Sequence, residues 1–151
     1  MKLAEALNLR ADLQKRIANL KERLLINAKV QEGESPTESP QMLLDELNNN
    51  IIELENIIKL INKTNSSTYI DGKSITDIIA KRDTLGLKLS ILRSFVSEAS
   101  NKINRYSATE IKILSSVNVA EKQKEIDNLS KEYRLIDTKL QELNWITDVI
   151  S

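Results

Sequence analysis

The stretch VQEGESPTESP, from Val30 to Pro40, decides how the rest of this 151-residue chain is organised. It holds both prolines, one of the three glycines and three glutamates, with no basic residue among them. The segments on either side carry apolar stripes at helical spacing, and a single helix cannot bury such a stripe alone. About ten polar residues are enough to reverse the chain between two helices. We therefore interpret the stretch as a loop between packed helices and not as a linker between domains. Its acidity then serves solubility, with partner binding as the alternative, since long loops are often functional.

Four segments carry apolar residues at alternating spacings of three and four, the pattern of helices that pack at small angles. The seams of the first two are Leu3, Ala6, Arg10, Leu13, Ile17, Leu20 and Leu24, then Leu44, Leu47, Ile51, Leu54, Ile58 and Ile61. Those of the other two are Ile78, Arg82, Leu85, Leu89, Leu92, Val96, Ala99 and Ile103, then Val119, Lys122, Ile126, Leu129, Tyr133, Ile136, Leu140 and Leu143. The pattern predicts helices at about 2–31, 40–64, 75–104 and 119–146.

The segments between the helices carry turn and capping signals. Ser39 is expected to cap the second helix, with Pro40 at its first position, where a missing N–H has no cost. Ser74 and Asn118 are the capping residues expected for the third and fourth helices. Asp71-Gly72 lies between two short apolar runs and predicts a β-hairpin. The alternation of Ile111, Ile113 and Val117 in TEIKILSSVN predicts one further short strand.

Apolar residues outside the seams, such as Ile52, Ile57 and Ile79, widen the stripes. A wide stripe suits a bundle, in which each helix has two neighbours, better than an isolated coiled coil. The sequence thus predicts an all-α fold: an antiparallel up-down-up-down bundle of four long helices, with a hairpin and one extra strand in the connections. The whole chain, residues 1–151, is expected to form a single domain.

Composition excludes several classes of function. Acidic and basic residues balance at 22 each, whereas nucleic-acid binders and proteins held on a membrane surface by charge need a basic face. The chain has no cysteine and no histidine, so zinc-thiolate sites and triads that need either residue are excluded. No cofactor is implied. The N-terminus lacks the apolar core of a signal peptide, and no window approaches a membrane span. A cytoplasmic protein is therefore expected. A magnesium or calcium site built from Asp and Glu alone stays open as a separate possibility.

One set of polar residues would meet if the helices run up, down, up and down. Arg10 and Arg82 occupy seam positions where leucine is expected, and a buried guanidinium must find acceptors. The candidate ligand-binding residues at this end are Arg10, Asn62, Asn65, Arg82, Asp83, Asp137, Gln141, Asn144 and Trp145. The favoured interpretation is a polar layer that fixes helix register. The alternative is a pocket for an anion or a small polar ligand.

The order of several segments resembles a bacterial family of uncharacterised proteins, the septicolysin-like proteins. These segments are RADLQKRI at Arg10, NAKVQEGE at Asn27, INKTN at Ile61, RD at Arg82, RYSATEIK at Arg105 and DTKLQELNW at Asp137. The resemblance implies an all-helical cytoplasmic protein that associates with itself, and it carries no enzyme activity over. The family name suggests a lysin, but the chain has no cysteine and a single tryptophan.

Three hypotheses for function follow. The first is a non-enzymatic protein that forms a homo-oligomer, a dimer or larger, and serves in assembly or in binding another protein. It rests on the wide apolar stripes and on the Ile111 strand, which lacks a partner in the chain. The second is an enzyme that binds a small polar ligand or metal with the Arg10, Arg82 and Asp83 end. The third, which composition disfavours, is a membrane-active lysin.

Overall fold

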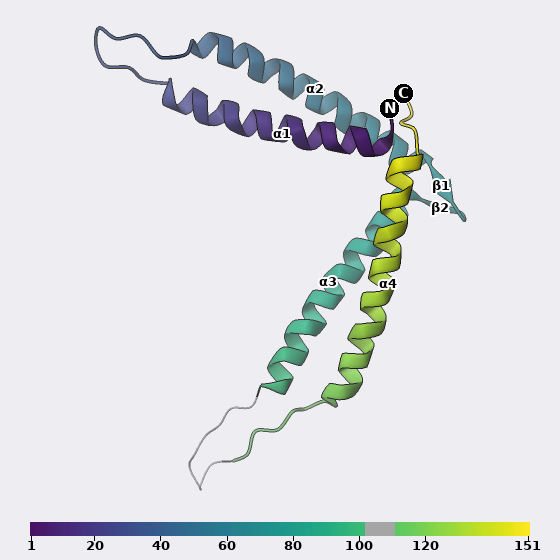
Figure 1. Cartoon of the computed structure of the whole chain (residues 1–151). Helices are drawn as coiled ribbons and strands as arrows, with labels where there is room; N and C mark the ends of the chain where they lie inside the picture. Colours follow the sequence, from purple (N-terminus) through teal and green to yellow (C-terminus); the bar gives the residue numbers. More distant parts are fainter. Residues whose placement is uncertain (102–110) are drawn as a thin grey trace. The chain divides into compact units, whose positions relative to one another are not determined.

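The computed structural model describes residues 1–101 and 111–151 (Figure 1). Within them the chain forms four helices, α1 (Leu3–Ile26), α2 (Pro40–Ser67), α3 (Ile75–Ser100) and α4 (Val119–Ile146), and a hairpin of β1 (Tyr69–Ile70) and β2 (Lys73–Ser74). The predicted all-α class with a short hairpin is confirmed. The chain divides into two compact units, Met1–Ser74 with Glu142–Ser151, and Ile75–Gln141. We call them unit 1 and unit 2. The single-domain organisation stays a prediction.

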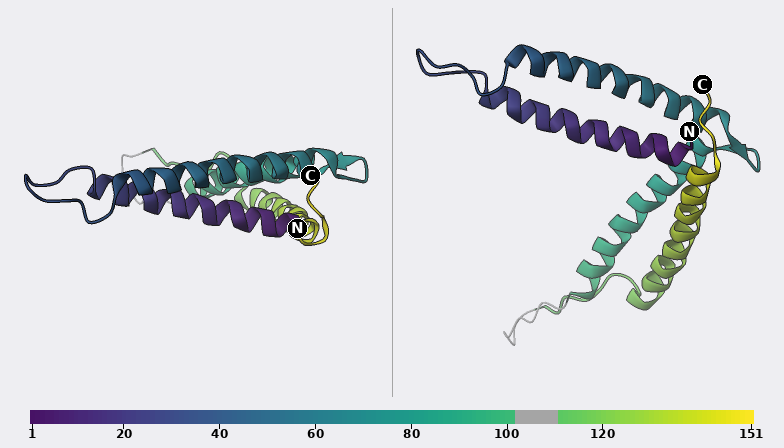
Figure 2. Two further views of the ribbon diagram at one scale, coloured as in Figure 1. Left: turned by 90° about the horizontal axis from the view of Figure 1, so that it is seen from above. Right: turned by 45° about the horizontal axis from the view of Figure 1, so that its top comes forward.

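Unit 1 is built on α1 and α2, which lie side by side and antiparallel in every view (Figures 1 and 2). On each helix one row of buried residues recurs every seven residues, the spacing that keeps a row on the same side of two packed helices. On α1 and its end this row is Ala6, Leu13, Leu20 and Asn27, and on α2 it is Leu43, Asn50, Ile57 and Thr64. Unit 1 therefore has a core built on two such rows, with polar residues at Asn27, Asn50 and Thr64.

The predicted seam of α2 was wrong in one of its two rows. Leu44 and Ile51 were expected in the core but are 41% and 45% exposed, whereas Leu43 and Ile57 are buried. Leu47 and Leu54 form the other row and are half-buried. Helical spacing allows the second row to lie three residues before them, at Leu44 and Ile51, or four residues before them, at Leu43 and Asn50. Asn50 and Thr64 belong to the buried row, so their polarity hid it from a search for apolar periodicity.

The stretch around Val30 to Pro40 is indeed a loop between α1 and α2. Asn27 fixes where this loop begins. The Asn27 side-chain Nδ2 donates to the Arg23 carbonyl at 2.8 Å, and the Glu38 N–H donates to Asn27 Oδ1 at 3.0 Å. Asn27 is 6% exposed. Because this side chain closes the last turn, α1 ends at Ile26 and not near residue 31 as predicted.

One of the three loop glutamates has a structural role, which corrects the interpretation that their acidity serves solubility alone. Glu38 accepts hydrogen bonds from both Nε and Nη2 of the Arg23 guanidinium, with Nε to Oε2 at 3.0 Å. The hydrogen bond from Arg23 is the main reason that the pKa of Glu38 lies below its ordinary value of 4.5. Glu32 and Glu34 are exposed. At the loop's far end Ser39 Oγ accepts from the Met42 N–H, so the predicted cap of α2 is confirmed.

At the other end of unit 1 the two termini meet. Leu3 N–H donates to the Thr147 carbonyl and Val149 N–H donates to the Met1 carbonyl, at 2.9 and 3.0 Å. Thr64, fully buried on α2, accepts from the Ile150 N–H at 2.9 Å and donates to the Leu60 carbonyl. The last residues of the chain are thus bound to α2 and to the start of α1.

Unit 2 contains α3 and most of α4, which contact each other through side chains. Its core cluster is Leu89, Val96 and Ile126, surrounded by Leu85, Leu92, Val119, Leu129 and Tyr133. All of these were seam residues in the predicted helices. Asn118 Oδ1 accepts from the Glu121 N–H, so the predicted cap of α4 is confirmed. The expected extension of α3 over 102–104, with Ile103, lies outside the described residues.

The connections differ in how far they follow the sequence pattern. Asp71 and Gly72 have φ of 51° and 78°, the left-handed pair that a two-residue hairpin turn requires, and β1 pairs with β2 as predicted. The extra strand was wrong within the described residues, since 111–118 form neither helix nor strand. Ile111 and Ile113 are 93% and 68% exposed. Alternation alone did not suffice, because a strand needs a partner for its backbone groups.

We predict that Asn27→Ala lowers the free energy of unfolding by about 1–3 kcal/mol, because it leaves the Glu38 N–H without its acceptor. Replacing Glu32 and Glu34 by serine should change it by less than ~0.5 kcal/mol, as is usual for exposed residues. Urea unfolding followed by circular dichroism measures both. Equal losses in the two variants would contradict a specific role for Asn27.

The Arg23–Glu38 pair should make stability depend on pH. Because the folded pKa of Glu38 is lowered, its contribution is present above the unfolded value and is lost as pH falls through the folded value. We therefore expect the parent to be more stable than Glu38→Gln at pH 6, and the gap to close as the pH falls well below 4.5. Thermal unfolding over pH 2.5–7 would test this. A gap that stays constant over that range would contradict it.

Candidate functional site

Three of the predicted site residues come together in unit 2. Arg82 on α3 donates through Nη1 to Asp137 Oδ1 on α4 at 3.0 Å, and through Nε to Asp83 Oδ1 at 3.1 Å. The Arg82 side chain is 25% exposed, against 61% for Asp83 and 39% for Asp137. Partial burial acts to lower the pKa of Arg82, but the hydrogen bonds to Asp83 and Asp137 outweigh it and raise the pKa. The guanidinium is thus neutralised within the protein, as in a polar layer, and offers little to an outside anion.

The other candidates take no part in these two ion pairs. Gln141 is exposed on α4 in unit 2. In unit 1, Arg10 and Asn144 are half-buried, Asn62 is exposed and Trp145 is 60% exposed. Asn65 Oδ1 is buried without a hydrogen-bond partner in the part of the chain that the structure describes. Convergence of Arg10 with Arg82 stays a prediction.

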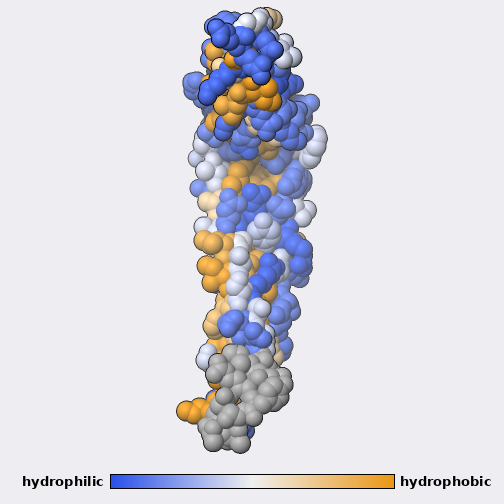
Figure 3. Space-filling view, turned by 90° about the vertical axis from the view of Figure 1, so that its left-hand side faces the viewer, coloured by the Kyte–Doolittle hydropathy of each residue, from blue (hydrophilic) through white to orange (hydrophobic). Residues whose placement is uncertain are grey.

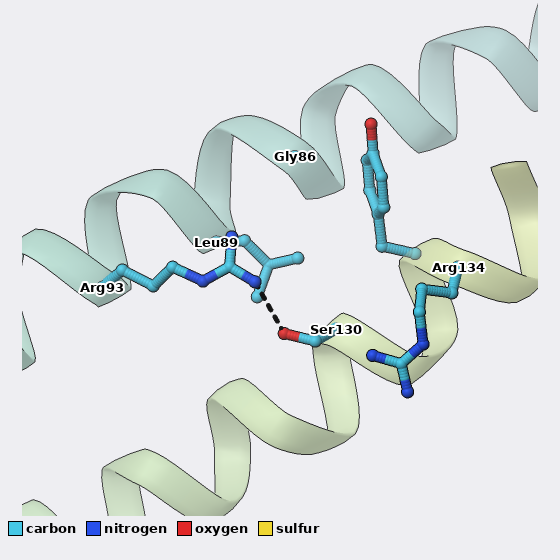
Figure 4. A pocket seen from close by; sticks show the side chains of 6 residues that line it. Gly86, Leu89, Arg93, Ser130 and Arg134 are labelled. Carbon is cyan, nitrogen blue, oxygen red and sulfur yellow. Dashed lines mark hydrogen bonds between the residues drawn. The ribbon is translucent and has the colours of Figure 1, made fainter.

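A pocket of about 360 Å³ opens between α3 and α4 in unit 2, and none of its lining residues is among the predicted site residues (Figure 4). It is lined by Gly86, Leu89, Arg93, Ser130, Tyr133 and Arg134. Figure 4 shows Arg93 reaching from α3 to α4, where its Nη2 donates to Ser130 Oγ at 2.9 Å. Arg134 follows one turn after Ser130 on the same helix. We call this the arginine pocket.

Gly86 sets the shape of one wall of the arginine pocket. A Cβ at this position would lie 3.1 Å from Cε2 of Tyr133, closer than side chains normally pack. Glycine inside a helix costs about 1 kcal/mol relative to alanine, so its place in the middle of α3 is accounted for by the aromatic ring beside it. The signal that could have found the pocket is this helical glycine, which directly follows the seam residue Leu85 and has no turn residue beside it.

A second feature of unit 2 is an apolar stripe on the outer side of α3. Leu87, Ile91 and Phe95 are 62%, 61% and 42% exposed. Leu87 and Ile91 are each two residues from the buried Leu89, which places them about 200° around the helix from it. We call these three residues the outer stripe. Figure 3, which faces α3, shows hydrophobic surface as a column that runs toward the grey residues.

The outer stripe continues into a groove at the end of α3. Phe95 and Ala99 line it together with Ile113, Leu114 and Val119, and Glu98 and Ser115 supply polar edges. Leu114 is 80% exposed. Large apolar residues therefore follow one another from the middle of α3 to the segment that precedes α4.

Two classes of site receive no support from the described residues. Within 1–101 and 111–151, no three Asp or Glu side chains gather as ligands for a metal ion. In the same ranges, no helix combines the length and the apolar character that crossing a bilayer requires.

Comparisons with known proteins identify relatives whose function is also open. The model of a family described as a family of unknown function, DUF6847, matches residues 10–149. A crystal structure of a functionally unknown conserved protein from Corynebacterium diphtheriae is 36% identical, with a TM-score of 0.93 over 99% of each chain. None of the curated proteins matches. The resemblance to septicolysin-like proteins stays a prediction.

We predict that Asp137→Ala lowers the free energy of unfolding by about 1 kcal/mol or less, as for partly exposed ion pairs. A fully buried arginine would lose about 3–5 kcal/mol when its partner is removed, but Arg82 keeps Asp83 and contact with water. Chemical unfolding of the parent and the variant distinguishes the two. A loss above ~3 kcal/mol would show that Arg82 is far more buried than its 25% exposure indicates.

Proposed function

This chain belongs to the family of unknown function DUF6847, and we propose that it is a non-enzymatic assembly protein that binds a second copy of itself through α3. The observation that carries the proposal is the outer stripe of Leu87, Ile91 and Phe95. A helix that is apolar on two sides needs a second partner, and within the described residues of unit 2 the core shared with α4 lies on the Leu89 side of α3.

The spacing of the outer stripe suits a symmetric pair. Leu87 and Phe95 lie four residues before and after Ile91. If two copies of α3 pack antiparallel about a two-fold axis beside Ile91, Leu87 of one copy faces Phe95 of the other and Ile91 faces its own copy. Such an isologous contact needs a self-complementary patch, which this arrangement supplies.

Charges beside the outer stripe do not oppose this pairing. Lys88 and Glu98 flank it and are exposed. In the antiparallel pair Lys88 lies opposite Ser94 of the second copy, and Glu98 lies opposite Thr84. Like charges are therefore kept apart, whereas like charges facing each other would select against the contact.

The required area indicates that the groove residues take part as well. A stable interface buries ~800 Å² on each partner, and even a large aromatic side chain contributes only ~150–250 Å². Three side chains fall short of that. Ile113 and Leu114, which share a groove with Phe95, would supply the remainder. This gives a role to the exposed residues that were expected to form a strand.

The competing hypotheses have less support. Arg82 is already paired with two carboxylates, which argues against an anion site there, and no observation favours a lysin. A cytoplasmic location forms part of this proposal and rests on the lack of cysteine, since disulfides are rare in that compartment.

Ile91→Glu should convert the assembly to a monomer of 17.1 kDa, because it places two carboxylates face to face at the two-fold axis. Light scattering after size exclusion, at tens of micromolar protein, measures the mass. The matched control is Leu135→Glu, which makes the same change at an isolated α4 residue that is 63% exposed, and it should leave the mass unchanged.

Two results would overturn the proposal. One is a parent protein that is monomeric at these concentrations. The other is a loss of assembly in Leu135→Glu equal to that in Ile91→Glu, with both variants still helical by circular dichroism, since α3 would then have no special part in the contact.

A further inference from the structure

The lining of the arginine pocket includes two arginines and a serine but no carboxylate. Elsewhere in unit 2 the cross-helix contacts of basic residues end on acids, as in Arg82 with Asp137 and Lys81 with Glu132. Arg93 instead donates to Ser130. Arg134 makes no ion pair within the described residues. In a chain whose charges balance, these two arginines form a local excess of positive charge.

The carboxylates one turn before Ser130 and one turn after Arg134 on α4 do not cancel this excess. Asp137 lies one turn after Arg134 on α4, and its Oδ1 accepts from Arg82. Asp127 lies one turn before Ser130, and its Oδ1 accepts from the Gln123 amide. Neither side chain lines the pocket. The positive charge is therefore left for a group from outside the chain.

From this we propose that the arginine pocket binds the phosphate group of a small phosphate monoester. Each guanidinium carries five N–H donors in a planar fork, and Arg93 uses one of them on Ser130. A single fork satisfies a carboxylate, whereas two forks suit the three terminal oxygens of a phosphate. Ser130 and Arg134 are four residues apart on one face of α4, so their side chains are neighbours.

The rest of the pocket favours a ligand with an apolar or planar part. Tyr133 and Leu89 supply an aromatic and an aliphatic wall, and the absence of a Cβ at Gly86 lets the ring of Tyr133 lie close to α3. The volume of about 360 Å³ lies at the lower end of the range for small-molecule sites. A phosphate attached to a single ring is the size of group that this space accepts.

Titration of the full-length protein with phenyl phosphate, followed by NMR of the backbone amides and arginine Nε–H groups, tests the proposal. We expect saturable shifts centred on Arg93, Ser130 and Arg134. Inorganic phosphate should bind several-fold more weakly because it cannot contact Tyr133, and benzoate more weakly still because a carboxylate needs only one fork. Benzoate binding as tightly as phenyl phosphate would overturn the assignment to phosphate.

Variants separate a built site from general attraction by charge. Arg134→Gln should weaken phenyl phosphate binding about tenfold or more, and Arg93→Gln should do the same. The matched control is Lys131→Gln, which removes the same charge from the same helix outside the pocket lining and should bind as the parent does. Because Arg134 has no hydrogen bond or ion pair within the described residues, its variant is expected to fold normally, which circular dichroism checks.

The proposal is wrong if the shifts grow linearly without saturation, or if Lys131→Gln weakens binding as much as Arg134→Gln does. It is independent of self-association, because the outer stripe lies on the other side of α3. Binding should therefore persist in Ile91→Glu, and its loss there would also overturn the proposal as stated.

Discussion

Unit 1 depends on one constraint: each of its two antiparallel helices must bury a row of residues that are spaced seven apart. The two helices have 24 and 28 residues, and each has one apolar side. Such a helix is not stable in water until its apolar side is covered. The loop that joins α1 to α2 makes the pairing local, so little chain entropy opposes it. The other features of unit 1 adjust to this pairing.

Polar residues at the ends of the rows show how the irregular segments are attached. Asn27 follows the row of α1 and accepts the Glu38 N–H from the loop. Thr64 ends the row of α2 and accepts the Ile150 N–H from the C-terminal segment. In each case a buried side chain at one end of the α1–α2 pair accepts a hydrogen bond from a backbone N–H that lies outside the helices. Buried polar residues in the rows thus close the two ends of the unit, where an apolar residue would leave those donors unpaired.

Unit 2 differs from unit 1 in leaving part of its helix surfaces uncovered, and both the proposed self-association and the proposed phosphate site lie there. Its core cluster is small, and α3 exposes apolar side chains on the side away from that core. Between α3 and α4, Arg82 takes a seam position where leucine is expected, and Arg93 and Ser130 lie directly beside the seam. The two helices are therefore linked partly by hydrogen bonds. A pair of helices with an uncovered apolar side and a polar cleft is suited to binding other molecules.

The sequence by itself determined the helices, the loop, the caps at Ser39 and Asn118 and the Asp71-Gly72 turn, because each of these depends on residues close together in the chain. Local rules of periodicity, capping and positive φ therefore suffice for them. Only the tertiary structure decided that Leu43 and Ile57, and not Leu44 and Ile51, are buried, since that choice depends on which side of α2 packs against α1. It also decided that Arg82 is paired, that residues 111–118 form no strand, and that Arg93, Ser130 and Arg134 surround a pocket. These depend on contacts between residues tens of positions apart, which no local pattern encodes.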